Sequence, residues 1–150
     1  MQSLFRYNWI VRDEWFELLR QLPEEELTKT RAGGVGSFLR TMTHIVDVED
    51  SWLRGLRGLP DVPFDEERYP TLADAKAFSD ACRPGVEDFV NAWTEERENE
   101  RLEPFTFGEV MRHVIAHEIH HIGQLSIWAR ELGLQPPSAN FIGRGLAKNG

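Results

Sequence analysis

The segment that follows Thr106 constrains the fold most, because both of its ends carry the signals of a long helix. Thr106 and Glu109 form a Thr-x-x-Glu capping box at its start. Gly133 can adopt the left-handed conformation that ends a helix, and the two prolines three and four residues further on prevent its continuation. The sequence therefore predicts one helix from about residue 107 to Leu132, followed by an irregular tail over residues 134–150.

Apolar residues at spacings of three and four predict three further helices. They are expected over about residues 4–22, from Val35 or Ser37 to before Gly58, and over about residues 71–99. Their end signals are Ser3 and Pro23 for the first helix, Gly58 for the second, and Thr71 with Asp74 for the third. Pro84 predicts a kink or a break in the third helix, and a short helical turn is expected at residues 24–27. In the tail, Phe141, Ile142 and Leu146 are expected to pack on the helices.

Strand signals are weak, because no stretch alternates apolar and polar residues and no Asn-Gly or Asp-Gly hairpin occurs inside the chain. Four helices without a sheet predict an all-α protein, a four-helix bundle. The length of 150 residues fits a single domain over residues 1–150.

Composition excludes several classes of protein. Lys and Arg number 17 against 25 Asp and Glu, a formal net charge of −8, and the basic residues do not cluster. We therefore expect no binding to nucleic acid or to an anionic membrane surface. No run of 18 apolar residues occurs, and the charged first 22 residues do not resemble a signal peptide. The single cysteine, Cys82, cannot form an internal disulfide, so a cytoplasmic location is expected.

Four of the five histidines fall within nine residues of the last predicted helix, which makes this cluster the most informative feature of the chain. At 100° per residue, His113, His117, His120 and His121 share an arc of about 100° with Gln124. Imidazoles on so apolar a helix are costly to bury without partners, and a metal ion would supply one.

Histidines at positions i and i+4 can bind one cation, and the third ligand must then come from another helix. His44 is the remaining histidine and lies in the middle of the second predicted helix. We therefore predict a three-histidine site formed by His44, His117 and His121, with coordination positions left open for water or substrate. The pair His113 and His117 has the same spacing and stays an alternative, whereas His120 is expected at the edge of the site or in solvent. A satisfied core histidine at position 44 and a pH-sensitive surface patch are the competing interpretations.

Two other metal-site motifs fit less well. His117 to His121 reads His-Glu-x-x-His, the zinc-protease signature with Glu118 as general base, but Gln124 and Ile127 stand where the extended motif has glycine and histidine. A di-iron bundle needs two Glu-x-x-His motifs, and the predicted helices contain one.

Several residues are candidates for roles around the metal. Asp47 and Gln124 can orient a ligand, and His113 can lie beside the site. Asn8, Trp9 and Trp52 can line the mouth of a pocket, although aromatic residues in such stripes usually belong to the core. Glu49 is expected to face the surface or a loop, and Cys82 to be an inert core thiol.

Three segments are similar to the DinB-like metalloenzymes. Residues 107–125, with His113, His117 and His121, resemble the last bundle helix of that family. Residues 37–52, with His44, resemble its second helix. Tyr7-Asn8-Trp9 together with Trp15 is similar to its first helix, so the resemblance is collinear over nearly the whole chain.

This resemblance implies an up-down-down-up bundle and a divalent metal, often nickel or zinc, held at the positions of His44, His117 and His121. It also implies a homodimer. Characterised relatives include S-transferases that use a bacillithiol-type thiol and a mycothiol-dependent isomerase.

The expected function is that of a metal-dependent enzyme acting on a small-molecule substrate. The metal would activate a low-molecular-weight thiol or a water molecule for transfer to, or hydrolysis of, a small electrophile. A thiol S-transferase is favoured slightly over a hydrolase. The alternatives are a non-catalytic, stress-related metal-binding bundle protein and, less favoured, a metallohydrolase of the His-Glu-x-x-His type.

Overall fold

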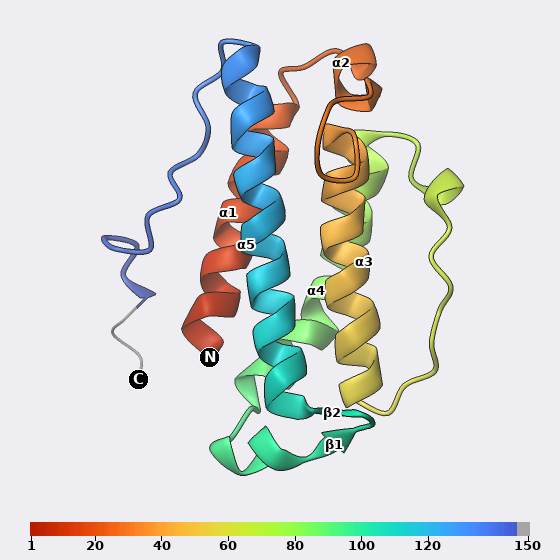
Figure 1. Cartoon of the computed structure of the whole chain (residues 1–150), viewed down its shortest axis with the longest axis vertical. Coiled ribbons are helices and arrows are strands. Elements are labelled where there is room, and N and C mark those ends of the chain that lie inside the picture. Colours follow the sequence, from red (N-terminus) through yellow and green to blue (C-terminus); the bar gives the residue numbers. More distant parts are fainter. Residues whose placement is uncertain (147–150) are drawn as a thin grey trace.

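Four long helices lie side by side along the long axis of the molecule (Figure 1). The computed structural model describes residues 1–146. Its elements, in chain order, are α1 (Gln2–Leu19), α2 (Glu24–Thr28), α3 (Phe38–Leu56), the 3-10 helix η1 (Glu66–Arg68), α4 (Leu72–Asn91), the 3-10 helix η2 (Glu95–Asn99), β1 (Arg101–Leu102), β2 (Phe105–Thr106) and α5 (Phe107–Glu131). None of the described helices is long and apolar enough to cross a membrane.

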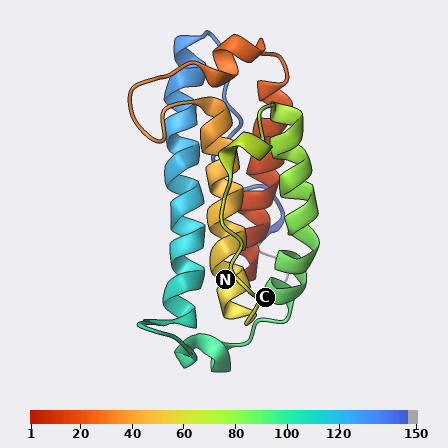
Figure 2. The ribbon, with the colours of Figure 1, turned by 90° about the vertical axis from the view of Figure 1, so that its right-hand side faces the viewer.

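The four long helices form a bundle with an up-down-down-up arrangement, as predicted (Figure 1). The segment between α3 and α4 runs the length of the bundle, so that both helices point downward (Figure 2). Contacts join α1 to α4, α4 to α3, α3 to α5 and α5 to α1, which gives the order of the helices around the bundle. α3 and α5 are therefore adjacent and antiparallel.

The ends of α3, α4 and α5 lie close to where their capping residues predict them. The hydroxyl of Ser37 accepts a hydrogen bond from the backbone N–H of Arg40 at the start of α3. Thr71 and Thr106 each form a complete capping box, with Asp74 and Glu109 as partners. Gly58 and Gly133 follow α3 and α5 with φ of 67° and 74°, in the left-handed region that glycine tolerates best.

Other predicted helix boundaries are wrong. Met1 is the N-cap of α1, so Ser3 lies inside the helix and is not its cap. α1 ends at Leu19 and not near residue 22, and the predicted turn after it is present as α2. α4 ends at Asn91, residues 92–94 are not helical, and Glu95–Asn99 form the separate 3-10 helix η2.

α4 continues through Pro84, where the sequence predicted a kink or a break. Proline removes one backbone hydrogen bond of the helix. Val86, Phe89 and Val90 are buried directly after it, and their packing keeps this turn helical. The predicted break is therefore wrong.

The expectation of a chain without a sheet is also wrong. β1 and β2 form a two-residue antiparallel pair in which Arg101 faces Thr106 and Leu102 faces Phe105. Strands of two residues are too short for an alternating pattern to reveal them. This hairpin closes the lower end of the bundle, next to the start of α5 (Figure 1).

Between residues 132 and 146 the described part of the tail is irregular and contains only turns and bends apart from its last residue. Phe141 and Leu146 pack against the upper apolar cluster, as predicted, but Ile142 is 91% exposed and does not. The last four predicted tail residues, 147–150, lie outside the described residues.

Two apolar clusters form the core, one toward each end of the bundle. Along α5 the lower cluster ends at Ile115 and the upper cluster begins at Ile122. The residues between them on α5 include a buried glutamate, Glu118, and facing them on α3 is buried Glu49. A polar layer therefore divides the core, and the histidines lie at its edge.

Candidate metal centre

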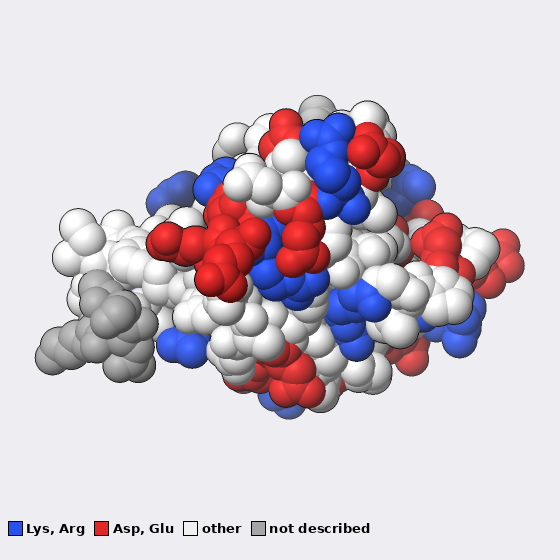
Figure 3. Space-filling model, turned by 90° about the horizontal axis from the view of Figure 1, so that it is seen from below, with Lys and Arg blue, Asp and Glu red and all other residues white. Residues whose placement is uncertain are grey.

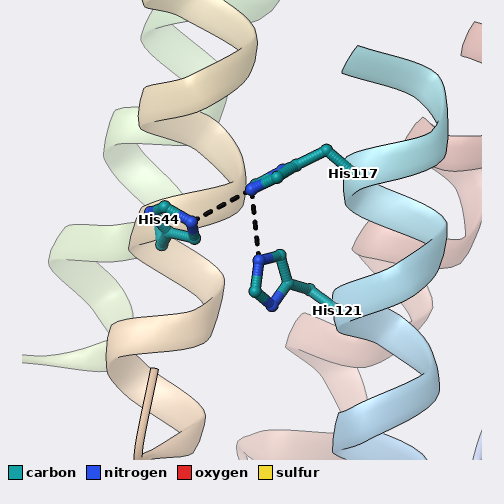
Figure 4. A group of neighbouring side chains, drawn as sticks. All are labelled: His44, His117 and His121. Carbon is teal, nitrogen blue, oxygen red and sulfur yellow. Dashed lines mark hydrogen bonds between the residues drawn. The ribbon is translucent and has the colours of Figure 1, made fainter. Parts of the chain in front are cut away.

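Three histidines from two helices meet between α3 and α5 (Figure 4). His44 projects from α3, and His117 and His121 project from successive turns of α5 toward it. The Nε2 atom of His117 lies 3.0 Å from Nε2 of His44 and 3.1 Å from Nε2 of His121. One ring nitrogen of each histidine lies within 4.8 Å of the other two. The structure thus brings together the three residues predicted as metal ligands.

The spacing of these nitrogens suits a cation better than a hydrogen-bonded cluster. A neutral imidazole nitrogen carries either one hydrogen or one lone pair, so Nε2 of His117 can form only one well-aligned hydrogen bond. It has two close Nε2 neighbours. Tetrahedral zinc with Zn–N bonds of about 2.0–2.1 Å holds its nitrogens roughly 3.3 Å apart, close to the spacing seen here. A cation between the rings would use all three lone pairs.

Gln124 fixes which nitrogen of His121 faces the cluster. Nδ1 of His121 lies 2.8 Å from Oε1 of Gln124, and because a carbonyl oxygen only accepts, Nδ1 carries the hydrogen and donates it. The lone pair of the neutral ring is then on Nε2, which points at His117. The amide nitrogen of Gln124 donates to His120 at 3.1 Å. Gln124 therefore contacts His121 as an orienting amide would, and exposed His120 lies outside the cluster.

Gly34 leaves room for the amide of Gln124. A Cβ atom at Gly34 would lie 2.6 Å from Oε1 of Gln124, closer than side chains allow, and its φ of 54° is in the left-handed region. The glycine-containing loop before α3 can therefore lie directly over the amide. The sequence shows Gly34 only as one of three clustered glycines, which indicates a loop but not a contact with α5.

The three rings are neutral near pH 7. Burial lowers the pKa of His44, and the neighbouring His121 lowers it further. Burial and the surrounding histidines lower the pKa of His117 to about 3. Burial also lowers the pKa of His121, although its hydrogen bond to Gln124 acts in the opposite direction. Neutral imidazoles are the form that binds metal ions.

A buried ion-pair network lies beside the histidines in the polar layer of the core. Arg12 of α1 donates from Nε and Nη2 to the carboxylate of Glu118, at 2.8 and 2.6 Å, and from Nη1 to Glu49 at 2.8 Å. The indole of Trp9 donates to the second oxygen of Glu49 at 2.9 Å. All four residues are buried. The network joins α1, α3 and α5 at the level of the metal centre.

This network corrects one prediction and removes the basis of one alternative. Glu49 is buried and paired with Arg12, so the expectation that it faces the surface or a loop is wrong. Glu118 turns toward α1, where Arg12 holds both of its oxygens, and it cannot reach the histidine cluster as the base of a zinc protease. Burial raises the pKa of Glu118, and the positive charge of Arg12 acts in the opposite direction. For Arg12, burial acts to lower the pKa, but the two carboxylates outweigh it and raise the pKa. Among the described residues, the group able to hold a metal contains no carboxylate, unlike a di-iron centre.

Asn8 and Asp47 do not contribute to the site as predicted. Asn8 is buried and donates from its side-chain amide to the backbone carbonyl of Ile115 at 3.2 Å, so it bridges α1 and α5 inside the core. The carboxylate of Asp47 accepts a hydrogen bond from Ser51 at 3.2 Å, and no bond from it to a histidine is found among the described residues. The prediction for Asp47 depended on its angular position on one helix, which does not determine what the neighbouring helix presents.

Trp52 and His113 lie next to the metal centre and contact each other. Their ring centroids are 5.6 Å apart, and the His113 ring is 5.8 Å from that of His117. Trp9, the other predicted pocket residue, is buried in the core. Trp52 and His113 line a small cavity together with Phe105, a residue that the sequence did not single out. No sequence signal marks Phe105, because it reaches Trp52 only through the hairpin.

Cys82 is half-buried, and its environment favours the protonated thiol. Burial and then the charges of Asp50 and Glu49 raise its pKa to about 12. Nucleophilic cysteines react as thiolates, so this one supplies no nucleophile near neutral pH.

Comparison with known proteins agrees with this architecture. A family model described as the DinB family matches residues 1–145. The uncharacterized protein YizA of Bacillus subtilis (strain 168) is 45% identical over 153 residues, with 97% of this chain and 96% of that protein covered. A crystal structure of a DinB-like protein from Bacillus cereus ATCC 10987 is 26% identical, covers 88% of this chain and 93% of its own, and has a TM-score of 0.59. With the bundle, its connections and these matches in agreement, the chain belongs to the DinB family.

Proposed function

We propose that His44, His117 and His121 bind a divalent metal ion, zinc or nickel, and that the protein is a metal-dependent enzyme for small electrophilic substrates. The observation that carries this proposal is the convergence of three neutral imidazole nitrogens on one point. Among the described residues this group offers three nitrogen ligands and no fourth, an arrangement typical of catalytic rather than structural zinc sites. When bound, the ion would lower the pKa of a coordinating thiol or water and so supply a nucleophile near neutral pH.

The protein residues around the cluster hold its geometry and leave the nucleophile to come from solution. Gln124 fixes the tautomer of His121, and Gly34 lets the loop before α3 cover that amide. Glu118 is engaged with Arg12 and the thiol of Cys82 stays protonated, so neither supplies a base or a nucleophile. These features support a small thiol or water as the attacking group.

We favour S-transfer from a low-molecular-weight thiol. In such a reaction the thiol gives up its proton to solvent, its sulfur bonds to the electrophilic carbon, and the leaving group departs with the electron pair of the broken bond. The preference over hydrolysis comes from the family resemblance, and the structure is compatible with both. Small-molecule electrophiles fit because a cavity lined by His113, the neighbour of His117, has a volume of about 190 Å³.

The test measures metal content and turnover in the same preparations. We expect one zinc or nickel ion per chain by elemental analysis, and metal-dependent release of chloride when bacillithiol or cysteine reacts with monochlorobimane. His117→Ala should lose both metal and turnover. Ile127→Ala, a change on the exposed side of α5, serves as the matched control and should keep both.

Three results separate the alternatives. Stoichiometric metal without turnover on a panel of thiols, esters and epoxides would support a non-catalytic metal-binding protein. Ester hydrolysis without thiol transfer would support the hydrolase. A wild-type protein that takes up neither zinc nor nickel would refute the metal site itself.

A homodimer also stays a prediction. Light scattering coupled to gel filtration would show a mass near twice the 17.3 kDa of the chain if it is right, and near 17.3 kDa if it is wrong.

A further inference from the structure

A small cavity lies at the lower end of the bundle, between α3, β2 and the first turns of α5. Its volume is about 190 Å³, and its lining residues are Trp52 of α3, Phe105 of β2, and Glu109, Val110 and His113 of α5. The rings of Trp52 and Phe105 meet edge to face with centroids 5.7 Å apart. Phe105 is 43% exposed, so this wall of the cavity faces solvent.

A row of rings links the cavity to the metal centre, with His113 in the cavity wall and His117 in the histidine cluster. His44 and His117 contact each other with centroids 4.8 Å apart, His117 and His113 at 5.8 Å, and His113 and Trp52 at 5.6 Å. His113 precedes His117 by four residues, which is about 6 Å along a helix axis. A group held in the cavity is therefore within reach of a short linker from the histidine cluster.

The chemistry of the cavity selects apolar groups. Its walls are two aromatic rings, an imidazole and a valine, and its one acid, Glu109, also caps α5. Oε2 of Glu109 accepts hydrogen bonds from the backbone N–H and the hydroxyl of Thr106, at 2.7 and 2.9 Å. These bonds hold the carboxylate at the start of α5, and the rest of the lining is aromatic or apolar. Charged side chains of both signs surround this end of the bundle, interspersed with uncharged surface (Figure 3).

The hairpin of β1 and β2 holds Phe105 beside Trp52. β2 is paired with β1, and Thr106, the next residue, is the N-cap of α5. Leu102 of β1 lies against α3 at Gly55, where a Cβ atom would be only 3.0 Å from its Cδ2. The absence of a side chain at Gly55 thus lets the hairpin pack close to α3 and bring Phe105 to Trp52.

We propose that Trp52, Phe105 and His113 form a specificity pocket that binds one aromatic ring, or an apolar group of similar size, of the substrate. The inference rests on the proposed function, because the rest of that substrate would lie at the histidine cluster. An apolar cavity of about 150 Å³ is enough to bind benzene. The pocket here has about 190 Å³, so it holds one ring and not two.

The experiment measures binding and needs no turnover. The probes are propionohydroxamate and 3-phenylpropionohydroxamate, which share the metal-chelating group and the two-carbon chain and differ only in the ring. Each is titrated calorimetrically into the zinc-loaded full-length protein. We expect the phenyl compound to bind at least about tenfold more tightly, because its ring leaves water for an apolar pocket.

Two variants test where the ring binds. Phe105→Ala should reduce the preference for the phenyl compound to about threefold or less, with the affinity for propionohydroxamate unchanged, and Trp52→Ala should do the same. Phe64→Ala is the matched control, since Phe64 is similarly exposed at 39% but stacks on Tyr69 and Phe78 elsewhere. It should keep the full preference. Circular dichroism verifies that each variant is folded.

The outcomes separate this inference from the proposed function. Equal affinities in the wild-type protein, or a preference that survives both pocket variants, would overturn the pocket. Absence of binding by either hydroxamate to zinc-loaded protein would overturn it as well, together with the open metal site. Loss of the preference for the phenyl compound in both variants supports the pocket. Absence of turnover with thiols and esters would count against the enzyme function but not against the pocket.

Discussion

Replacing Arg12 by methionine tests whether the ion-pair network holds the bundle together. Arg12 is fully buried and is the cation between two buried carboxylates, Glu49 and Glu118. Methionine fills similar space but leaves both carboxylates without their partner. Breaking a buried ion pair in this way costs about 3–5 kcal/mol. In a chain of 150 residues this corresponds to a melting temperature lower by roughly 6–20 °C.

The pH dependence of this loss has a definite sign. Burial already raises the pKa of Glu118, and removal of Arg12 takes away the main opposing influence. A carboxyl group whose pKa is higher in the folded state than in the unfolded one destabilises the fold at pH values above both. The deficit of Arg12→Met should therefore be largest near pH 7.5 and shrink as the pH falls toward the unfolded value of about 4.3.

The assay is equilibrium unfolding in urea, followed by circular dichroism at pH 7.5 and 5.5 with metal removed by chelator. Arg83→Met provides the matched control, because Arg83 pairs at 3.3 Å with a half-exposed Asp13. That pair is expected to contribute less than about 1 kcal/mol. If Arg12→Met is no less stable than Arg83→Met, or if its deficit grows at pH 5.5, the reasoning about the buried network is refuted.

Three further predictions concern the metal centre and its surroundings. Gly34→Ala should weaken zinc binding by about 10–100-fold, because its Cβ would displace the amide of Gln124; competition with a chromophoric chelator measures the affinity. Gly33→Ala, where a Cβ would meet nothing within 4 Å, should have a smaller effect on zinc affinity. The metal-free protein should lose stability as the pH falls below about 6.5, the pKa of histidine in an unfolded chain. The pKa of His117 in the folded protein is lowered to about 3, so over this range the unfolded chain binds more protons than the folded one. A melting temperature that rises as the pH falls would contradict the neutral cluster. Cys82, with a pKa of about 12, should resist iodoacetamide at pH 7.5 in the native protein and react only after unfolding, as mass spectrometry would show.

Local chemistry made the helix ends and the histidine face predictable. The capping boxes at Thr71 and Thr106 act within four residues, so the sequence alone identifies them. The positions of His117 and His121 on one face follow from the helical repeat. The prediction that His44 joins His117 and His121 came from its position in an apolar stretch. His44 meets them in the structure because α3 and α5 are neighbours.

Contacts between helices could not be predicted in the same way. Asn8 and Glu49 are polar residues whose surroundings depend on how α1 and α3 are rotated in the bundle, and both proved buried. Arg12 reaches Glu118 across 106 positions of sequence, a pairing that no local pattern encodes. Phe105 was missed for a related reason, since a two-residue strand pair carries no detectable periodicity.

The placement of the ion-pair network suggests why the core contains charges at all. Apolar clusters tolerate small rotations and shifts of helices, whereas paired charges require one register. Glu49 follows His44 by five residues and Glu118 directly follows His117, so a movement that separates these histidines would also pull the carboxylates from Arg12. Replacing all three charged residues together, Arg12→Met with Glu49→Leu and Glu118→Leu, should therefore recover most of the stability lost in Arg12→Met alone, because apolar replacements of buried ion pairs are often neutral. Zinc affinity should still fall by about tenfold or more, since the ion pairs that join α3 and α5 through Arg12 would then be absent. Recovery of both stability and full zinc affinity in the triple variant would show that apolar packing alone sets the register, and that the buried charges have no part in shaping the metal site.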